Sequence, residues 1–327
     1  EESETLYVWD FSDESQTAES GSNIPVLGGN AVYDSANGAV KMTSTNSSGG
    51  TLGVTFDEPV RTVQGEEITV VSKIAYGRQG GSYMDYSITD SNGTELIGSH
   101  ICVYSSSGAQ SLRIGGEELL GSGLPAGITT SNRNNDGILN GYTTFTATLS
   151  PDTNTITLTV SNDEGETTFT GSFPDGTSCD VGALNFSTTQ TYASRSCYVD
   201  DISITKTKAP SYTIGLEARN SANAVIGNAV VTVTDSKYGI VIEPESDGKH
   251  HLCDGAYSYT VTAEGYETVT EELELSQATP SKTITVTMAK SGSTDPDPTP
   301  SATAEPEQPM PTADPGEEPE PTPTSPA

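Results

Sequence analysis

The sequence predicts an all-β protein made of an antiparallel β-sandwich, a second and smaller β-sandwich, and a disordered tail. Short alternating segments rich in Thr, Val, Ile and Tyr are interrupted about every 8 to 12 residues by Gly, Asn, Asp or Pro. This pattern is typical of antiparallel sandwiches, because side chains along a strand point alternately toward the core and toward solvent. The sequence offers no stretch that combines helical periodicity with convincing capping residues.

Residues 1–208 contain the strands of the larger sandwich. The segments EEITVVSKIAY, YMDYSITD and TELIGSHICVY are joined by turns at GRQGGS and SNG. The first strand, TLYVWDFSDES, carries the only Trp, and we expect Trp9 to pack in the core because its strand is apolar on both sides of it. The strand YVDDISITKT closes this unit, and the KAP segment then interrupts the strand pattern.

Residues 209–290 repeat the strand pattern in a shorter unit, which is long enough for a small sandwich of its own. The order GNAVVTVTD, DGAYSYTVTAEGYET and a final alternating strand resembles the transthyretin-like or pilin-B-like Greek-key modules of bacterial surface and secreted proteins. The resemblance implies a spacer. Some pilin-B-like modules carry a Lys-to-Asn or Lys-to-Asp isopeptide bond, but YTIGLEAR has no Lys and KTITVTMAK no Asn or Asp. We therefore expect no crosslink.

Residues 291–327 are rich in Pro and acidic residues and contain no cation and no aromatic ring. Such a segment cannot bury enough apolar surface to fold, so we predict a disordered, extended linker. A linker implies something to link. We therefore expect catalytic or anchoring modules covalently attached outside this chain, and the alternative is that the tail is the free end of a subunit.

The chain has 14 Lys and Arg against 45 Asp and Glu, a formal net charge of −31. Nucleic acids and anionic membranes are bound through clustered cations, so this balance argues against both as partners. A run of about 18 apolar residues, as a membrane span requires, is absent from the sequence, and we expect no membrane insertion. The chain starts at Glu1 without a signal segment, so we interpret this start as the result of processing or truncation.

Several features argue against a catalytic or zinc site. The sequence has no G-x-S-x-G elbow, no H-E-x-x-H motif and no phosphate loop. Acidic residues are so frequent that carboxylate pairs occur by chance, and they are no evidence for a glycosidase. His100 lies in an alternating strand, where a structural role is the more frequent one. The four cysteines lack C-x-x-C spacing, and one disulfide and buried free thiols remain open alternatives: Cys102, Cys179, Cys197 and Cys253.

The first and last strands of the larger unit carry acidic residues that suggest a structural Ca²⁺. In many sandwiches these two strands pair, which would bring Asp10 and Asp13 near Asp200 and Asp201. Crowded carboxylates repel one another unless a cation lies between them. The alternative is that the four acids point to solvent. A second stretch, NRNNDGILNG, resembles the opening of a calcium loop, but its twelfth position is Thr143 where a calcium loop has Glu.

The stretch KIAYGRQGGSYMDYSITDSNG groups scarce cations with tyrosines. Aromatic rings pack against the apolar faces of sugars, and Arg or Lys binds the carboxylate of a uronic acid. Tyr83 and Asp85 alternate with Met84 and Tyr86, so one of these pairs faces the core. We predict a ligand-binding site for an acidic saccharide that comprises Tyr76, Arg78, Tyr83, Arg113, Arg133 and Arg195. The alternative for each arginine is a solvated surface position.

The segments YVWDFSDES, NGAVKMT, AYGRQGGSYMDYSITDSNGTEL, SNRNNDGILNGYTTFTATLSPDTNTITLTV and CYVDDISIT together resemble a concanavalin-like or jelly-roll accessory module. Such modules occur in secreted, multimodular proteins of anaerobic gut bacteria that degrade pectin and plant cell walls. The resemblance covers residues 5–207. It implies a jelly-roll fold and non-catalytic binding of plant polysaccharide, with pectin-like homogalacturonan as first choice, within a larger enzyme such as a pectate lyase. The alternatives are a structural or adhesive spacer of a bacterial surface protein, and an enzyme.

Overall fold

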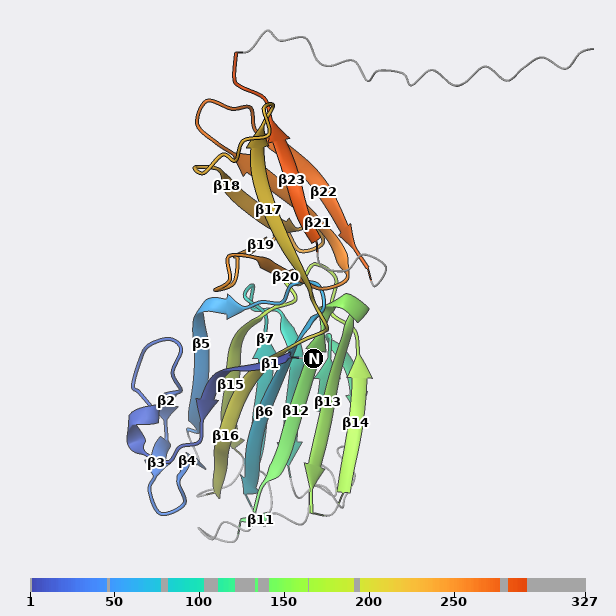
Figure 1. Ribbon diagram of the computed structural model, residues 1–327. Coiled ribbons are helices and arrows are strands. Elements are labelled where there is room, and N and C mark those ends of the chain that lie inside the picture. The colour runs from blue at the N-terminus through green and yellow to red at the C-terminus, as the bar shows by residue number, and fades with distance from the viewer. Residues whose placement is uncertain are drawn as a thin grey trace, which may run out of the picture.

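The computed structural model describes residues 2–45, 48–77, 82–102, 111–120, 133–134, 141–163, 165–190, 195–276 and 282–292. Within these ranges the regular elements are β-strands and two 3-10 helices, η1 (Glu14–Gln16) and η2 (Pro151–Thr153). Figure 1 shows a larger body of strands below and a smaller one above. The protein is all-β, as its sequence predicts. The tail expected to be disordered lies outside the described residues from position 293 onward.

The first sheet of the larger body has nine strands, which follow the path β14, β13, β12, β6, β16, β4, β3, with β1 paired to β16 and β11 to β6. On β12, Phe145, Ala147 and Leu149 are fully buried and alternate with more exposed threonines, which is the period of two expected for a sandwich. The strand bounds are β1 (Glu2–Trp9), β3 (Ala31–Asp34), β4 (Ala39–Ser44), β6 (Glu66–Gly77), β11 (Arg133–Asn134), β12 (Thr143–Ser150), β13 (Thr155–Asn162), β14 (Gly165–Gly171) and β16 (Arg195–Lys208).

The second sheet has seven strands in the order β10, β9, β8, β7, β15, β5, β2, and all its neighbours pair antiparallel. On β7, Met84 and Tyr86 are buried and Asp85 is not, which decides between the two faces that the sequence left open. The strand bounds are β2 (Val26–Gly29), β5 (Gly50–Val60), β7 (Ser82–Thr89), β8 (Glu95–Cys102), β9 (Ser111–Ile114), β10 (Glu117–Leu120) and β15 (Val181–Gln190).

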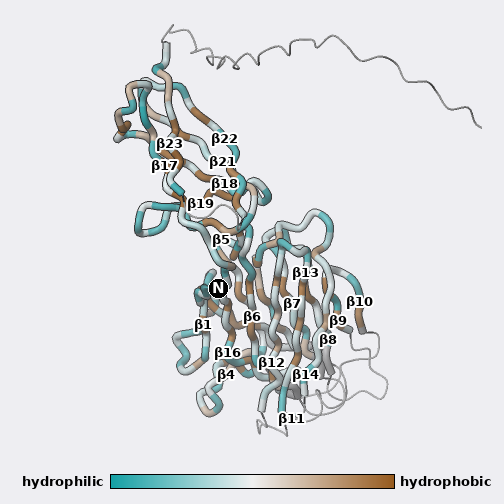
Figure 2. Tube along the Cα trace, turned by 45° about the vertical axis from the view of Figure 1, so that its right-hand side comes forward, coloured by the Kyte–Doolittle hydropathy of each residue, from teal (hydrophilic) through white to brown (hydrophobic). Residues whose placement is uncertain are grey.

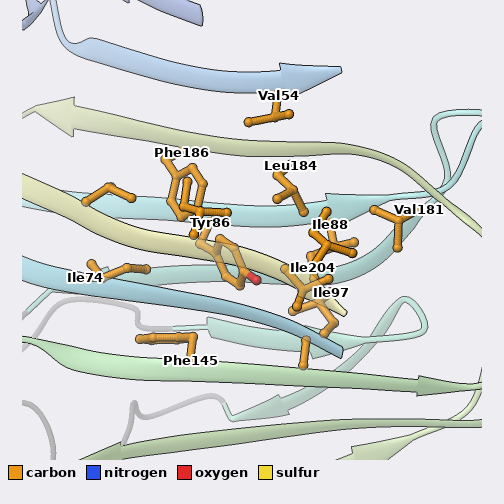
Figure 3. Packing of buried hydrophobic residues seen from close by; sticks show 14 of the residues in the cluster. Val54, Ile74, Tyr86, Ile88, Ile97, Phe145, Val181, Leu184, Phe186 and Ile204 are labelled. Carbon is orange, nitrogen blue, oxygen red and sulfur yellow. The ribbon is translucent and has the colours of Figure 1, made fainter. Parts of the chain in front are cut away.

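The two sheets pack face to face over an apolar core. Figure 3 shows Tyr86 of β7 beside Phe186 of β15 and facing Phe145 of β12, with ring centroids 5.0 and 5.6 Å apart. Edge and tilted contacts of this kind add to the stabilisation from burial. Trp9 is 6% exposed and stacks on Tyr7, so its expected place in the core is confirmed. The larger body is therefore an antiparallel sandwich of the jelly-roll class.

The smaller body contains two further sheets, one with the order β20, β17, β23 and one with the order β19, β18, β21, β22. β17 and β23 pair parallel, and the other neighbours pair antiparallel. Ile214, Val233, Tyr257 and Val261 lie in a core separate from that of the larger body. The strand bounds are β17 (Tyr212–Asn220), β18 (Val230–Asp235), β19 (Val241–Ile242), β20 (His250–Leu252), β21 (Gly255–Thr262), β22 (Val269–Leu275) and β23 (Lys282–Met288).

A polar junction joins the two bodies at the end of the sandwich opposite β11 (Figures 1 and 2). Gln64 of the larger body donates to the Asp235 carboxylate through its backbone N–H at 2.7 Å and its Nε2 at 2.9 Å. From the smaller body, Lys237 Nζ and the Tyr238 hydroxyl donate to Asp152 of the larger body at 2.8 and 2.7 Å. Burial raises the pKa of Asp152, but the hydrogen bonds outweigh it and lower that pKa overall.

Hydropathy follows this arrangement. In Figure 2 the hydrophobic residues, coloured brown, lie mainly in the strands, and the connecting segments of both bodies are mainly hydrophilic. Among the described residues, no helix has the length and apolar character needed to cross a membrane. The independent folding of residues 1–208 and 209–290 stays a prediction.

Candidate functional site

The outward side of the seven-stranded sheet carries polar side chains on neighbouring strands. Cross-strand register places Ser87 of β7 opposite Asn185 of β15 and Gly98 of β8. One row further, Asp85 lies opposite Ser187 and His100. Because Met84, Tyr86 and Ile88 occupy the core side of β7, the alternate residues must project outward. We call this surface the outer face.

A groove of about 470 Å³ lies on the outer face over β2, β5 and β15. Its lining combines small residues with hydroxyl and amide groups: Gly21, Val26, Gly28, Thr51, Leu52, Gly53, Thr55, Asn185, Phe186 and Ser187. Gly28 lies close to Thr51, because a Cβ atom at position 28 would lie 2.5 Å from Thr51 Oγ1 and would displace that hydroxyl. The groove therefore exists because strands distant in sequence bring small residues together.

The polar groups of the groove are available to a ligand. Within the described part of the chain, the side chains of Thr51, Thr55, Asn185 and Ser187 form no hydrogen bond with another protein group. Three of them are exposed and Ser187 is partly exposed. Hydroxyl and carboxamide groups both donate and accept hydrogen bonds, so they match the hydroxyl groups of an uncharged polar ligand.

Beside the groove, ionisable side chains of the outer face form pairs. Arg113 donates to Glu95 through Nε at 2.8 Å and through Nη2 at 3.0 Å, a two-point contact that raises the pKa of Arg113. His100 Nδ1 lies 2.5 Å from Asp85 Oδ1. The structure thus brings the predicted site residue Arg113 to the outer face, but Glu95 already holds its guanidinium.

Four other predicted site residues gather at one end of the sandwich. Tyr76 and Arg133 lie opposite each other where β6 pairs with β11. Tyr83 lies at the start of β7, which follows β6, and Arg195 begins β16, whose Tyr198 lies opposite Ala75. These are backbone positions. Arg78 lies outside the described residues, as do the side chains of Tyr76, Tyr83, Arg133 and Arg195, so their joint role in binding stays a prediction.

The aspartates expected to bind Ca²⁺ have other partners. Asp10 accepts from Ser12 N–H at 3.0 Å and Gln16 Nε2 at 2.6 Å, and these hydrogen bonds lower its pKa. Asp13 caps η1 by accepting from Ser15 N–H at 2.8 Å. All four aspartates are described, yet among the described residues no three His, Cys, Asp or Glu side chains meet as a metal site. The calcium hypothesis gains no support from this arrangement.

The cation beside the closing strand is a lysine. Lys73 of β6 forms an ion pair with Asp201, which sits in a bulge of β16 with a positive φ of 43°. Asp200 is partly buried. Burial, and to a smaller extent repulsion from the Asp201 carboxylate, raise the pKa of Asp200 to about 6. Burial and the Asp200 carboxylate also raise the pKa of Tyr142. Lys73, one of the two cations in the stretch that suggested a sugar site, therefore has a structural partner.

Comparison with known proteins identifies similar folds only. No protein-family model and no curated protein matches the chain. Among solved structures, the CBM2 module of Lactobacillus casei BL23 phage J-1 evolved Dit has 14% identity and a TM-score of 0.45, covering 62% of this chain and 95% of the other. Peanut lectin has 14% identity and a TM-score of 0.41, covering 64% and 99%. The Bauhinia forficata lectin in complex with GalNAc has 10% identity and a TM-score of 0.41, covering 63% and 99%.

These similarities are weak and assign neither a family nor a ligand to this chain. The fold class follows from the sheet order described above, and the groove follows from its own lining residues. Sequence reasoning missed the groove because its residues come from three segments far apart in the chain. The alternating polar positions in GTLGVTF and ALNFSTT were visible, but the adjacency of β5 and β15 was not.

Proposed function

We propose that the larger sandwich is a non-catalytic carbohydrate-binding module that directs a secreted or cell-surface protein to plant cell-wall polysaccharide. The observation that carries this proposal is the groove on the outer face, where Thr51, Thr55, Asn185 and Ser187 have no protein partner. A saccharide offers many hydroxyl groups of matching hydrogen-bonding capacity. An exposed sheet surface also suits an extended chain better than a small compact molecule.

The preferred glycan in this proposal is acidic, with pectin-like homogalacturonan as first choice. Arg113 is committed to Glu95, so the preference depends on Arg78, which lies outside the described residues, and on the residues whose backbones lie at the end of the sandwich near β11: Tyr76, Tyr83, Arg133 and Arg195. A guanidinium binds a uronic acid carboxylate through two parallel hydrogen bonds. In this proposal the groove contacts sugar hydroxyls and the arginines contact carboxylates.

A spacer or adhesive role is the second candidate function, and one observation favours it. The junction around Asp235 and Asp152 ties the smaller body to the larger one through several hydrogen bonds. A spacer that holds neighbouring modules at a fixed distance benefits from such a connection. In the proposed function the smaller body serves this purpose within a multimodular polysaccharide-degrading protein.

Isothermal titration of the full chain with homogalacturonan, xylan and galactan tests the proposal. We expect homogalacturonan to bind best and its affinity to fall with added salt, because exposed charges are screened over about 8 Å at physiological ionic strength. Arg78→Ala should weaken this binding. Arg219→Ala is the control, since Arg219 is held by Glu217 in the smaller body.

Each alternative result has a definite meaning. Equal affinity for neutral and acidic glycans would remove the acidic preference and leave the groove as the binding site. Absence of binding to every glycan would overturn the carbohydrate-binding proposal and leave the spacer role.

A further inference from the structure

A second hollow, on the smaller body, has a different chemistry from the groove. Its volume is about 290 Å³, and it is lined by Thr213, Gly215, Lys249, Lys282 and Thr283. β17 lies at the centre of the three-stranded sheet, between β20 and β23. The hollow therefore draws residues from all three strands or their immediate flanks.

Strand register explains why two lysines share this hollow. Ile214 of β17 lies opposite His250 of β20 on one side and opposite Lys282 of β23 on the other. Lys249 precedes His250, so the two lysines flank β17 near Gly215. Gly215 has no side chain to fill the space between them, and a Cβ atom there would lie 3.4 Å from Thr283 Oγ1.

Neither lysine forms an ion pair with a described carboxylate. Within the described residues, Lys249 and Lys282 are exposed and take part in no ion pair. Lysines elsewhere do contact carboxylates, among them Lys73, Lys206, Lys208 and Lys237. Residues 277–281, which precede Lys282, contain no acidic residue.

Asp247, the nearest acid in sequence to Lys249, interacts electrostatically with Lys249, but its oxygens are hydrogen-bonded to other groups. Asp247 accepts from the backbone N–H of Lys249 at 2.9 Å, and its other carboxylate oxygen lies 3.1 Å from His251 Nε2. Two unpaired ammonium groups in one hollow repel each other, and an anion between them removes that repulsion. In a chain with 45 acidic residues, this pairing of free cations points to an anionic ligand.

We propose that this hollow is a second binding site, which takes the carboxylate of a uronic acid residue. Lys249 and Lys282 contact the carboxylate, and the hydroxyl of Thr283 binds a hydroxyl group of the same sugar. The choice of a sugar acid as the ligand rests on the proposed function. The smaller body then contributes to binding as well as to spacing, and the two sites together hold a long acidic chain more firmly than either alone.

An NMR titration of the full chain with digalacturonate tests this site. We expect the backbone amide signals of Gly215 and Thr283 to shift, and Lys249→Gln combined with Lys282→Gln to weaken that binding about fivefold, since exposed charge pairs contribute modestly. Lys290→Gln removes a lysine charge from the same body outside the hollow and should leave the shifts unchanged. Neutral galactobiose should produce no shift at Gly215.

Contradictory outcomes separate this inference from the proposed function. If the double variant behaves like the Lys290→Gln control, or if galactobiose shifts Gly215 equally, the hollow is not a carboxylate site. Glycan binding at the groove with no shift at Gly215 would overturn only this inference. No binding at either place would overturn both.

Discussion

Asp235 at the junction and Asn185 in the groove are both polar side chains on β-strands, but their surroundings are opposite. Asp235 is fully buried and accepts from Gln64, both at the backbone N–H and at Nε2, and from the backbone N–H groups of Lys237 and Tyr238. Asn185 is exposed and its side chain has no protein partner among the described residues.

The difference teaches how to separate structural from ligand-binding polar groups in this molecule. A buried carboxylate is tolerated only when hydrogen bonds replace the water it has lost, so Asp235 is explained by stability. Asn185 and its neighbours contribute nothing comparable to the fold. In the proposed function, these groups gather over one groove because they bind a ligand there.

The largest expected effect is on stability at the junction. Asp235→Ala leaves the N–H groups of Gln64, Lys237 and Tyr238 without an acceptor in a buried place. We expect the free energy of unfolding to fall by about 3 kcal/mol, measured by denaturant titration. Asp235→Asn retains one acceptor oxygen and should lose less. Equal stability of the alanine variant and the wild type would mean that the junction is not formed as described.

The next prediction is a loss of glycan binding without a loss of protein stability. Asn185→Ala combined with Ser187→Ala removes two hydrogen-bonding groups, each worth about 1 kcal/mol, so glycan affinity should fall about tenfold or more in calorimetry. The melting temperature should stay the same, because neither side chain bonds to the protein. Thr170→Ala on the other sheet is the matched control. A stability loss as large as that of Asp235→Ala would contradict the contrast between the two regions.

A smaller effect depends on pH and involves Asp200. Its pKa is 3.8 in a free side chain and about 6 in the folded protein, so the folded state holds the proton more tightly. The contribution of Asp200 to stability is therefore fully present below about pH 3.8 and is lost as the pH rises through 6. Asp200→Asn should melt at a higher temperature than the wild type at pH 8 and show no such advantage near pH 4. A difference independent of pH would refute this assignment.

The smallest expected effect is that of a chelator. Asp10 and Asp13 bind neighbouring donors and Asp201 binds Lys73, so removal of divalent ions should leave the melting temperature of the full chain unchanged. A clear decrease on addition of EDTA, reversed by Ca²⁺, would restore the calcium hypothesis.

The fold could be predicted from the sequence because the alternation of apolar and polar residues along a strand is a local signal. Buried apolar residues occupy alternate positions in β7, as at Met84 and Tyr86, and in β12, and Trp9 lies in an apolar strand. Strands and core residues can therefore be predicted from residues that are close together in the sequence. Strands β18 and β21 of the smaller body were visible in the sequence for the same reason.

The candidate sites required information that is not local. The groove depends on β5 lying beside β15, and the lysine hollow depends on β17 lying between β20 and β23. The pairing of Arg113 with Glu95 was equally hidden, because β8 and β9 belong to different segments of the sequence. Residue type alone therefore suggested arginines as binding groups without showing which of them the protein already uses.

The central claim is that the groove over β2, β5 and β15 holds a saccharide. A crystal structure of the full chain with a homogalacturonan fragment tests this most directly. The account predicts a sugar residue in the groove with its hydroxyl groups within hydrogen-bonding distance of Asn185 and Ser187. A saccharide bound elsewhere on the molecule, with the groove occupied by water alone, would contradict it.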